Sequence, residues 1–434
     1  MDVCVVGLGK IGLPLAVQIA SKGHKVIGVD ISSEIVEKIN QSIEPFSGEE
    51  NLSEMLTSAV NSQLLFATTD ISMAVKQSEY ILIVVPLVID EDGKIDFSNI
   101  DSVTNSVAKE LKEGSVVIYE TTLPVGTTRG RLAPKISEIS GLEVGKEFFL
   151  VYSPERVFSG RIFSDLQKYP KLVGGVGKKS TEKGIEFYEA FLDFIPRDDL
   201  SKLNGVWEMS SADAAEFAKI AETTFRNVNI ALSNEFAKFS QENGLDIFEV
   251  IEASNSQPFS LIHRPGIAVG GHCIPVYPKF YLENSPNAIL PYEAIKINES
   301  MPNFAIETIK NVFGSVAGKK VVVFGAAYRG GVKEIAFSGV KPIVQKLNEL
   351  NADVFVHDVL FDSFELKELG YKAYTLGDEC DIAIFQADHK EYLDLLPEDI
   401  PGVKLVLDGR GFLEADKWSN LLLINLGVAF ERKI

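Results

Sequence analysis

Ten residues near the start of the chain, Val3-Cys4-Val5-Val6-Gly7-Leu8-Gly9-Lys10-Ile11-Gly12, predict a buried β-strand that runs into a glycine-rich turn. The apolar run Leu13 to Ala20 predicts a helix after the turn, which Gly23-His24 would close. A second strand, Lys25 to Val29, ends in Asp30. This order of strand, turn, helix, strand and acid predicts a doubly wound α/β domain.

The glycines of the turn form the G-x-G-x-x-G pattern of dinucleotide-binding sites. Gly7 would permit the tight turn, Gly9 would let a pyrophosphate approach the backbone, and Gly12 would let helix and strand pack closely. Asp30 can accept hydrogen bonds from a ribose 2′-OH, and Ile31-Ser32-Ser33 offers no arginine for a 2′-phosphate. The pattern therefore predicts NAD as the cofactor. The alternative is an ordinary glycine-rich turn between strand and helix.

Further apolar runs predict additional strands of this sheet, and ligands bind beyond the carboxyl ends of parallel strands. The run Tyr80 to Val85 ends at Pro86, and Val116 to Tyr119 ends at Glu120-Thr121-Thr122. These ends are expected to line the cofactor site. The expected cofactor-binding residues are Gly7, Gly9, Lys10, Ile11, Gly12, Asp30, Pro86 and Thr122.

A carboxylate follows another strand, Phe148 to Val151, within Tyr152-Ser153-Pro154-Glu155-Arg156. Glu155 is a candidate for acid–base work because it lies at a strand end. A surface ion pair between Glu155 and Arg156 is the alternative. Lys171 to Gly175 predicts one more strand of the same sheet.

Residues 210–243 contain neither proline nor glycine, and their apolar side chains recur at spacings of three and four. They predict one helix of about 30 residues, capped by Ser210 or Ser211 and ended by Gly244. Such a helix typically bridges two domains or forms the core of a dimer. Lys219 and Arg226 share one of its faces, which is either a solvated stripe or a polar strip that faces a ligand.

A reactive side chain stands in the turn Gly270-Gly271-His272-Cys273-Ile274-Pro275. The glycines let the backbone turn sharply, and the proline prevents a helix there. Cys273 is therefore a candidate nucleophile, although a buried loop cysteine is the common alternative. The other two cysteines, Cys4 and Cys380, border apolar runs and are expected in the core.

The last part of the chain predicts a second doubly wound unit, with a strand entering a turn at Gly325 and a helix at Val340 to Leu350. Another helix, Pro291 to Met301, precedes it. The predicted fold class is α/β, with two Rossmann-like doubly wound parallel-sheet domains joined by a long central helix. The expected domains cover residues 1–200, 201–314 and 315–434.

The chain has 434 residues and a formal net charge of -19, which argues against a general affinity for nucleic acid or anionic membranes. Its apolar runs are too short to span a bilayer. Three cysteines cannot form a disulfide framework, so a cytoplasmic location is expected. The five histidines do not fall at ligand spacings, and no metal site is expected.

Five ordered stretches, covering nearly the whole chain, resemble the UDP-glucose/GDP-mannose dehydrogenase family of nucleotide-sugar 6-dehydrogenases. The helix and cysteine stretches resemble most the members that act on UDP-N-acetylhexosamines. The stretches are Val6 to Pro14, Glu120 to Thr127, Tyr152 to Arg156, Lys219 to Ala231, and Gly270 to Pro275.

The resemblance implies that a sugar C6 alcohol is oxidised to a carboxylate while two NAD+ are reduced. Cys273 would form a thiohemiacetal and then a thioester, Lys219 would stabilise oxyanion charge, and Thr122 and Glu155 would handle a water. The partner implied is a nucleotide sugar, and a homodimer or higher homo-oligomer is expected from the long helix. The implied substrate-binding residues are Arg226, Phe259, Gly266, Tyr328 and Arg329.

The chain departs from the family at several positions. Tyr277 stands where an aspartate is usual, and Ala336 where an arginine is usual. Thr223 replaces an asparagine, Leu87 a threonine and Arg329 a lysine. Three hypotheses follow: the usual four-electron oxidation, a partial or different NAD-dependent reaction, or a non-catalytic nucleotide-binding paralogue.

Overall fold

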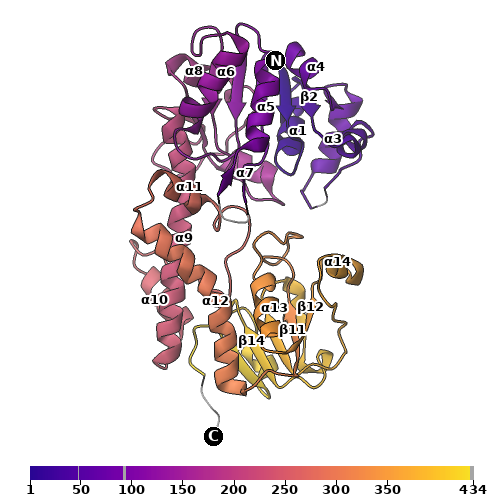
Figure 1. The fold of residues 1–434 in the computed structure, drawn as a ribbon, viewed down its shortest axis with the longest axis vertical. Coiled ribbons are helices and arrows are strands. Elements are labelled where there is room, and N and C mark those ends of the chain that lie inside the picture. Colours follow the sequence, from indigo (N-terminus) through magenta and orange to yellow (C-terminus); the bar gives the residue numbers. More distant parts are fainter. Residues whose placement is uncertain (47, 91–93, 431–434) are drawn as a thin grey trace. The chain divides into compact units, whose positions relative to one another are not determined.

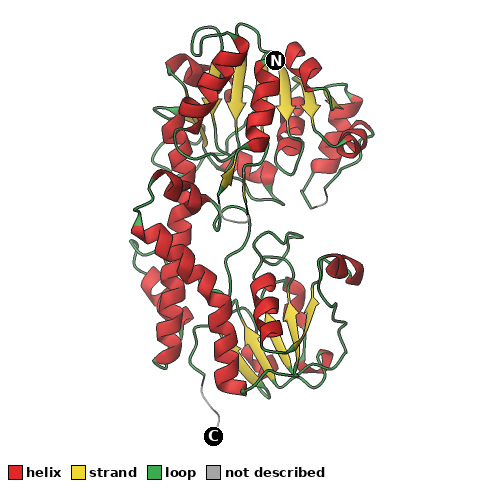
Figure 2. Ribbon diagram, in the orientation of Figure 1, coloured by secondary structure: helices red, strands yellow, loops and turns green. Residues whose placement is uncertain are grey.

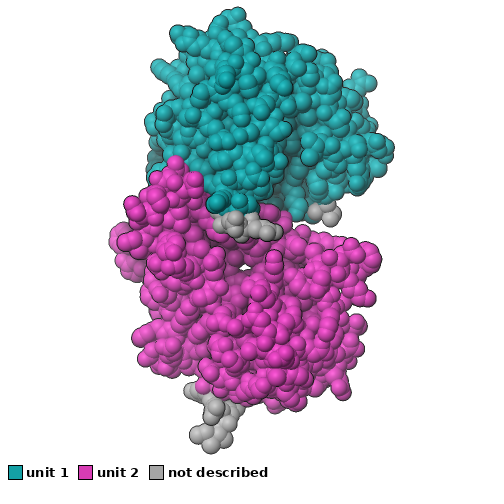
Figure 3. Space-filling view, in the orientation of Figure 1, with its two compact units in different colours: residues 1–221 teal, residues 222–434 magenta. Residues whose placement is uncertain are grey.

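The structure is a computed structural model that describes residues 1–46, 48–90 and 94–430 (Figure 1). Two compact units make up the chain, residues 1–221 and residues 222–434 (Figure 3). Each unit contains one large sheet, with helices between most successive strands (Figure 2). This arrangement confirms the predicted α/β class with two Rossmann-like sheets.

In the described part of the first unit, eight strands form a sheet in the order β10-β9-β8-β7-β4-β1-β2-β3. Neighbouring strands run parallel except β8 and β9, which are antiparallel. The predicted strands of this unit are confirmed within two residues at each end. The bounds are β1 Asp2–Val6, β2 Lys25–Val29, β3 Leu65–Thr68, β4 Tyr80–Ile83, β7 Val116–Tyr119, β8 Phe149–Tyr152, β9 Lys171–Gly175 and β10 Val206–Glu208, with a separate antiparallel pair, β5 Val88–Ile89 and β6 Ile95–Asp96.

The central strands of this sheet are apolar at every position because helices cover them. All residues of β4 and β7 are buried, and Leu13, Val17 and Ile19 of the first helix pack in the same core as Val3 and Val5. The helices are α1 Gly12–Ser21, α2 Ser33–Asn40, α3 Leu52–Asn61, α4 Ile71–Gln77, α5 Ser98–Ala108, α6 Ala133–Ser140, α7 Ile162–Lys168 and α8 Lys178–Glu189, with a π-helical turn at Thr128–Leu132.

The predicted long helix is α9, Ala212–Glu242, which has 31 residues. The Ser211 hydroxyl accepts a hydrogen bond from the Ala214 N–H at 3.1 Å and so caps its start. Gly244, at φ +76°, ends it in the left-handed conformation. The boundary between the two units falls inside α9, so this helix joins them.

In the described part of the second unit, five parallel strands form a sheet in the order β12-β11-β13-β14-β15. Cys380 is buried there, as Cys4 is in the first unit, and both predictions of core cysteines are confirmed. The bounds are β11 Lys320–Phe324, β12 Asp353–His357, β13 Ile382–Phe385, β14 Leu405–Asp408 and β15 Leu422–Asn425, with helices α10 Ile247–Asn255, α11 Tyr277–Asn284, α12 Ile289–Phe313, α13 Val340–Glu349 and α14 Ser363–Glu368, and short 3-10 turns at Lys390–Asp394, Pro397–Asp399 and Ala415–Trp418.

The prediction that this unit's helix from Pro291 ends at Met301 is wrong, because the helix continues beyond that residue. It is α12, Ile289–Phe313, and Pro302 lies in its interior. Proline lacks an N–H and normally breaks a helix at that point. Here the second half of α12 buries Ala305, Ile306 and Ile309 in the core of the unit, and this packing outweighs the lost hydrogen bond.

Candidate functional site

The glycine turn after β1 has three glycines with three different surroundings. Gly7 adopts φ +94°, and a Cβ there would lie 2.9 Å from the Val84 carbonyl oxygen. A Cβ on Gly12 would lie 1.8 Å from the Gly7 carbonyl oxygen. A Cβ on Gly9 would meet nothing within 4 Å. Gly7 and Gly12 are therefore required by the backbone, whereas Gly9 borders open space in which a phosphate fits.

Asp30 follows β2 and lies beside this turn. Its carboxylate accepts hydrogen bonds from the Leu8 N–H at 2.9 Å and the Ser32 N–H at 3.0 Å. The next side chain, Ile31, is 99% exposed and offers no positive charge. Asp30 retains lone pairs that can accept from ribose hydroxyls, so the chemistry of this turn fits NAD.

The ends of β4 and β7 meet through Thr121, whose hydroxyl donates to the Val85 carbonyl oxygen at 2.5 Å. Thr122 is buried, and Leu87 is buried where the family resemblance predicts a threonine. The predicted cofactor residues Lys10 and Ile11 lie between the glycines, exposed and half-buried respectively.

A buried cluster of charges lies beyond the ends of β7 and β8. The Lys171 ammonium is 3.1 Å from Glu120 Oε1 and 2.8 Å from Glu155 Oε2. The Tyr188 hydroxyl donates to Glu120 Oε1. The side chains of Glu120, Lys171 and Glu155 are 0%, 5% and 11% exposed. Glu155 is therefore not at the surface, as the alternative of a surface ion pair requires, and it contacts a buried lysine that the sequence placed only in a strand.

The two carboxyl groups of this cluster titrate differently. Burial raises the pKa of Glu120 to about 7. Burial also acts on Glu155, but the charge of Lys171, its hydrogen bond and the Arg156 N–H hold the pKa of Glu155 below its ordinary value. Lys219 contributes to that lowering. The structure thus brings together two predicted catalytic residues, Glu155 and the buried Lys219.

The position of Lys219 depends on Glu216, one turn earlier on α9, which sequence reasoning missed. The Glu216 carboxylate accepts hydrogen bonds from the Gly126 N–H at 2.6 Å and from the N–H and hydroxyl of Thr128 at 2.8 and 2.6 Å. Burial raises the pKa of Glu216 to about 7 despite these bonds. Its only sequence signal is a carboxylate on the buried face of a helix.

The Cys273 turn belongs to the second unit and packs against Tyr328. A Cβ on Gly270 would lie 2.5 Å from Tyr328 Cβ, and one on Gly271 would lie 3.1 Å from the Tyr328 ring. The Gly271 N–H donates to the Ala336 carbonyl oxygen at 2.8 Å. Cys273 is half-buried, so its thiol is held in a defined turn without full enclosure.

Two further contacts hold this turn from its other side. The Asn227 amide on α9 donates to the Ile274 carbonyl oxygen at 3.2 Å. The Tyr277 N–H donates to the Cys273 carbonyl oxygen at 2.9 Å and begins α11. Tyr277 therefore stands at the first position of a helix, where the resemblance predicts an aspartate.

Arg410 is a second residue that sequence reasoning missed. Its guanidinium donates to the carbonyl oxygens of Gln386 at 2.7 Å, Ala268 at 3.0 Å and Tyr328 at 3.0 Å. It also lies close to Gly266, where a Cβ would be 3.0 Å from Nη1. One half-buried cation therefore ties the segment leading to Cys273 to the predicted substrate residue Tyr328.

The remaining predicted substrate residues of the second unit differ in exposure. Arg226 lies 3.6 Å from Glu222, one turn away on α9. Arg329 is half-buried, and its Nε donates to the Tyr328 hydroxyl at 3.2 Å. Phe259 is 92% exposed, so nothing in its own unit covers it.

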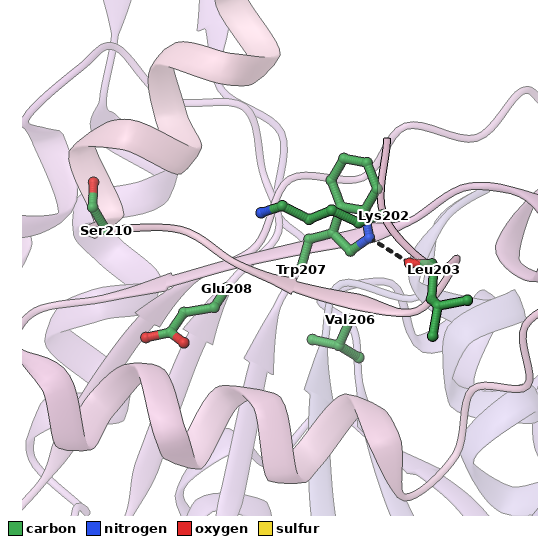
Figure 4. A pocket seen from close by; sticks show the side chains of 6 residues that line it. All are labelled: Lys202, Leu203, Val206, Trp207, Glu208 and Ser210. Carbon is green, nitrogen blue, oxygen red and sulfur yellow. Dashed lines mark hydrogen bonds between the residues drawn. The ribbon is translucent and has the colours of Figure 1, made fainter. Parts of the chain in front are cut away.

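A hollow of about 540 Å³ lies at the β10 edge of the first sheet (Figure 4). The Trp207 indole N–H donates to the Leu203 carbonyl oxygen at 2.8 Å, and Lys202 Nζ lies 5.6 Å from the Trp207 ring. β9, β8, β7 and β4 separate β10 from β1, so this hollow is remote from the glycine turn. Its lining residues are Lys202, Leu203, Val206, Trp207, Glu208 and Ser210.

The described residues lack two features that would indicate other classes of function. Within residues 1–46, 48–90 and 94–430, no group of three or more His, Cys, Asp or Glu side chains is arranged to hold a metal ion. No helix among the same residues has the length and apolar character needed to cross a membrane.

Sequence models of the UDP-glucose/GDP-mannose dehydrogenase family match the chain in three parts. The NAD binding domain matches residues 1–192. The central domain matches residues 213–301. The UDP binding domain matches residues 322–415. These ranges contain the glycine turn, the Cys273 turn and Tyr328, in that order.

Whole-length relatives carry dehydrogenase names. UDP-N-acetyl-D-mannosamine dehydrogenase of Methanocaldococcus jannaschii is 34% identical, over 96% of this chain and 93% of that protein. NDP-N-acetyl-D-galactosaminuronic acid dehydrogenase of Ralstonia solanacearum is 30% identical, over 96% and 97%. The solved UDP-D-ManNAc dehydrogenase of Pyrococcus horikoshii aligns with a TM-score of 0.87 at 30% identity, covering 98% of this chain and 99% of that one.

The substitution Arg410→Lys tests the role of the half-buried guanidinium. A lysine cannot satisfy three carbonyl groups in different directions, and each orphaned buried acceptor costs about 1–3 kcal/mol. We expect the free energy of unfolding of the second unit to fall by about 3 kcal/mol. Trp418 is buried in this unit and is one of two tryptophans in the chain, so its fluorescence in a Trp207→Phe background reports urea unfolding there.

The matched control is Arg264→Lys, because Arg264 makes one hydrogen bond, to the Gly411 carbonyl oxygen. This variant should lose less than about 1 kcal/mol. Equal effects of the two substitutions would contradict the role assigned to Arg410.

Proposed function

The chain belongs to the UDP-glucose/GDP-mannose dehydrogenase family, and we propose that it oxidises C6 of a UDP-N-acetylhexosamine to the uronate through a Cys273 thioester. It is an NAD-dependent nucleotide-sugar dehydrogenase with an NAD binding domain and a UDP binding domain. The substrate class rests on relatives named for UDP-N-acetyl-D-mannosamine and an N-acetylgalactosaminuronic acid.

One observation carries the proposal: the Cys273 turn, in which two glycines pack on Tyr328 and leave the thiol half-buried. A thiolate is a strong nucleophile and a good leaving group, so it can both add to an aldehyde and be displaced from a thioester. The fully buried thiols of Cys4 and Cys380 cannot serve, because burial raises the pKa of each to about 12.

The proposed reaction assigns a task to each catalytic residue. Bound NAD+ is the hydride acceptor in both oxidations, and two are consumed per uronate. Cys273 adds to the C6 aldehyde as a thiolate, and the resulting thiohemiacetal oxyanion loses a hydride to give a thioester. Glu155 takes a proton from water as that water attacks the thioester, and the Cys273 thiolate leaves. Lys219 stabilises the oxyanion, and Thr122 orients the water.

The residues proposed to bind NAD lie in the first unit, and those proposed to bind the UDP-sugar lie in the second. Gly7, Gly9, Lys10, Ile11, Gly12, Asp30, Pro86 and Thr122 would hold NAD. Arg226, Phe259, Gly266, Tyr328 and Arg329 would hold the UDP-sugar. We also propose the functional parts 1–200, 201–314 and 315–434, which the three matched ranges support.

Tyr277 and Ala336 favour a second candidate, a reaction that stops before the uronate. Each stands where the family resemblance predicts a charged side chain, and loss of one such group typically costs about 10²–10³ in rate. A protein with a slow second half-reaction would release aldehyde rather than carboxylate. Product analysis separates the two candidates.

We further propose that a second copy of the chain covers one face of α9. Phe225, Leu232, Phe236 and Phe239 are 53%, 44%, 38% and 60% exposed. Their spacings of seven, four and three residues give them one side of the helix. A regular apolar stripe is self-complementary, as a two-fold dimer interface requires.

The decisive activity measurement combines the protein with NAD+ and UDP-ManNAc, UDP-GlcNAc or UDP-glucose, and follows NADH with mass spectrometry of the products. We expect two NADH per uronate from one N-acetylhexosamine. Cys273→Ala should reduce uronate formation by roughly 10³-fold or more, because no other group takes over covalent catalysis.

Cys380→Ala is the control, since it removes a buried thiol that the reaction does not use. One NADH per sugar with an aldehyde product would support the interrupted reaction instead. Absence of turnover with all three sugars would refute the proposed substrate class.

Asp30→Ala tests cofactor choice. The variant loses a charged acceptor whose hydrogen bonds contribute about 1.5–3 kcal/mol, so the KM for NAD+ should rise about 10–100-fold while activity with NADP+ gains relative to NAD+. Asp70→Ala is the matched control, because Asp70 caps α4 through the Met73 N–H and should leave the KM unchanged. An unchanged KM in Asp30→Ala would contradict the assignment.

Phe236→Glu tests the α9 face. A buried charge in a two-fold interface meets its own copy and remains unpaired, so dimers should dissociate to monomers at micromolar concentrations. Sedimentation velocity measures the change. Leu376→Glu, at a residue 41% exposed outside α9, should leave the mass unchanged. A stable Phe236→Glu dimer would exclude this face as the interface.

A further inference from the structure

The reversal of β9 places a lysine where two parallel strands end. β7 and β8 are parallel, so Glu120 and Glu155 both lie beyond carboxyl ends of the sheet. β9 is antiparallel to β8, with Tyr152 opposite Gly174 and Val151 opposite Gly175. Lys171, the first residue of β9, therefore lies at that same edge and pairs with Glu155 at 2.8 Å.

The two carboxyl groups of this cluster share the Lys171 ammonium. Lys171 contacts both Glu120 and Glu155, and its ammonium also lies 4.8 Å from the Tyr188 ring centroid. Among the described residues, no group donates a hydrogen bond to Glu120 Oε2, which is buried. The charge of Lys219 acts on Glu155 as well, so with both carboxyl groups charged Glu120 would be the less compensated one out of contact with water, which is unfavourable by several kcal/mol.

A single proton removes this imbalance, and the surroundings select its place. Glu155 Oε1 accepts the Arg156 N–H at 2.7 Å, Oε2 accepts from Lys171, and the Lys219 charge acts on it as well. Glu120 has Lys171 and the Tyr188 hydroxyl on one oxygen and nothing on the other. Hydrogen bonds favour the charged form of Glu155, and burial favours the neutral form of Glu120.

We propose that Lys171 and Glu120 are positioning residues that fix the charge of Glu155: Lys171 holds it as a carboxylate, and Glu120 carries the proton of the cluster. This inference rests on the proposed function, in which Glu155 takes a proton from the attacking water. A base must be unprotonated at the working pH, and the ammonium of Lys171 ensures this without contacting substrate.

The titratable groups of the cluster come from five parts of the fold, which are β9, α8, α9 and the segments after β7 and β8. They are Lys171 on β9, Tyr188 on α8, Lys219 on α9, and the two carboxyl groups themselves. The pKa of Tyr188 is raised well above its ordinary value by burial and by Glu120, so its hydroxyl stays a donor. Glu120, whose pKa burial raises to about 7, is therefore the group of this cluster that changes charge near pH 7.

The first test is the pH profile of uronate formation in Lys171→Met. An opposite charge at hydrogen-bonding distance lowers a carboxyl pKa by about 1–3 units, so the acid limb of the profile should move up by about that amount. Lys171→Arg keeps the cation and should restore most of the wild-type profile. Lys178→Met removes a lysine whose side chain is 84% exposed and should change nothing. An unchanged acid limb in Lys171→Met would overturn the role of the lysine.

The second test needs no turnover. Infrared titration detects the carbonyl absorption of protonated carboxyl groups, and wild-type protein should lose such a band near pH 7. Glu216 also has a pKa raised to about 7 by burial, so the difference between wild type and Glu120→Gln isolates Glu120. Glu155→Gln removes the competing carboxylate and should move the Glu120 band to lower pH.

The outcomes separate this inference from the proposed function. Absence of turnover on any sugar would refute the substrate class. The infrared titration would still show which of Glu120 and Glu155 carries the proton. A wild-type band that persists in Glu120→Gln and vanishes in Glu155→Gln would place the proton on Glu155 and overturn the inference. If Lys171→Met fails to fold, Lys171→Arg and Glu120→Gln decide it by the same two readouts.

Discussion

The polar side chains on the buried faces of α9 are the constraint on which both candidate sites depend. In the first unit, Glu216 accepts three hydrogen bonds from the loop after β7. In the second unit, Asn227 donates to the backbone next to Cys273, and Asn234 accepts from the Gly266 N–H at 3.0 Å. The side chains of a helix project at fixed angles, so these hydrogen bonds fix the position of each loop relative to α9. Lys219 lies between Glu216 and Asn227 on the same helix, so its position is fixed together with theirs.

Much of the fold was predictable because it depends on local sequence. The glycine pattern with Asp30, the long helix without glycine or proline, and the two-glycine turn before Cys273 are short-range signals. The interior Pro302 and the reversal of β9 were not predictable, because packing far along the chain decides them. The contact between Glu155 and Lys171 was not predictable for the same reason, since Lys171 reaches Glu155 only through the antiparallel register.

Backbone contacts explain how the Cys273 turn keeps its structure despite the departures from the family at Ala336 and Tyr277. Ala336 contributes its carbonyl oxygen to the Gly271 N–H, a contact that any residue could make. Tyr277 likewise uses its N–H to bind the Cys273 carbonyl oxygen. The Cys273 turn therefore keeps its backbone support without the charged side chains that the resemblance predicts. Sequence departures at these positions alter the side chains beside the turn more than they alter its backbone.

Charge balance links the remaining residues of the first unit. Buried carboxyl groups persist only when a cation, several N–H donors or a proton compensates them. Glu155 has a cation and an N–H, Glu216 has three donors, and Glu120 has a shared cation and one hydroxyl. The cation and the N–H hold the pKa of Glu155 below its ordinary value, whereas burial raises the pKa of both Glu216 and Glu120 to about 7. In the proposed arrangement Glu120 carries the proton of the cluster, and that proton keeps the shared lysine available to Glu155.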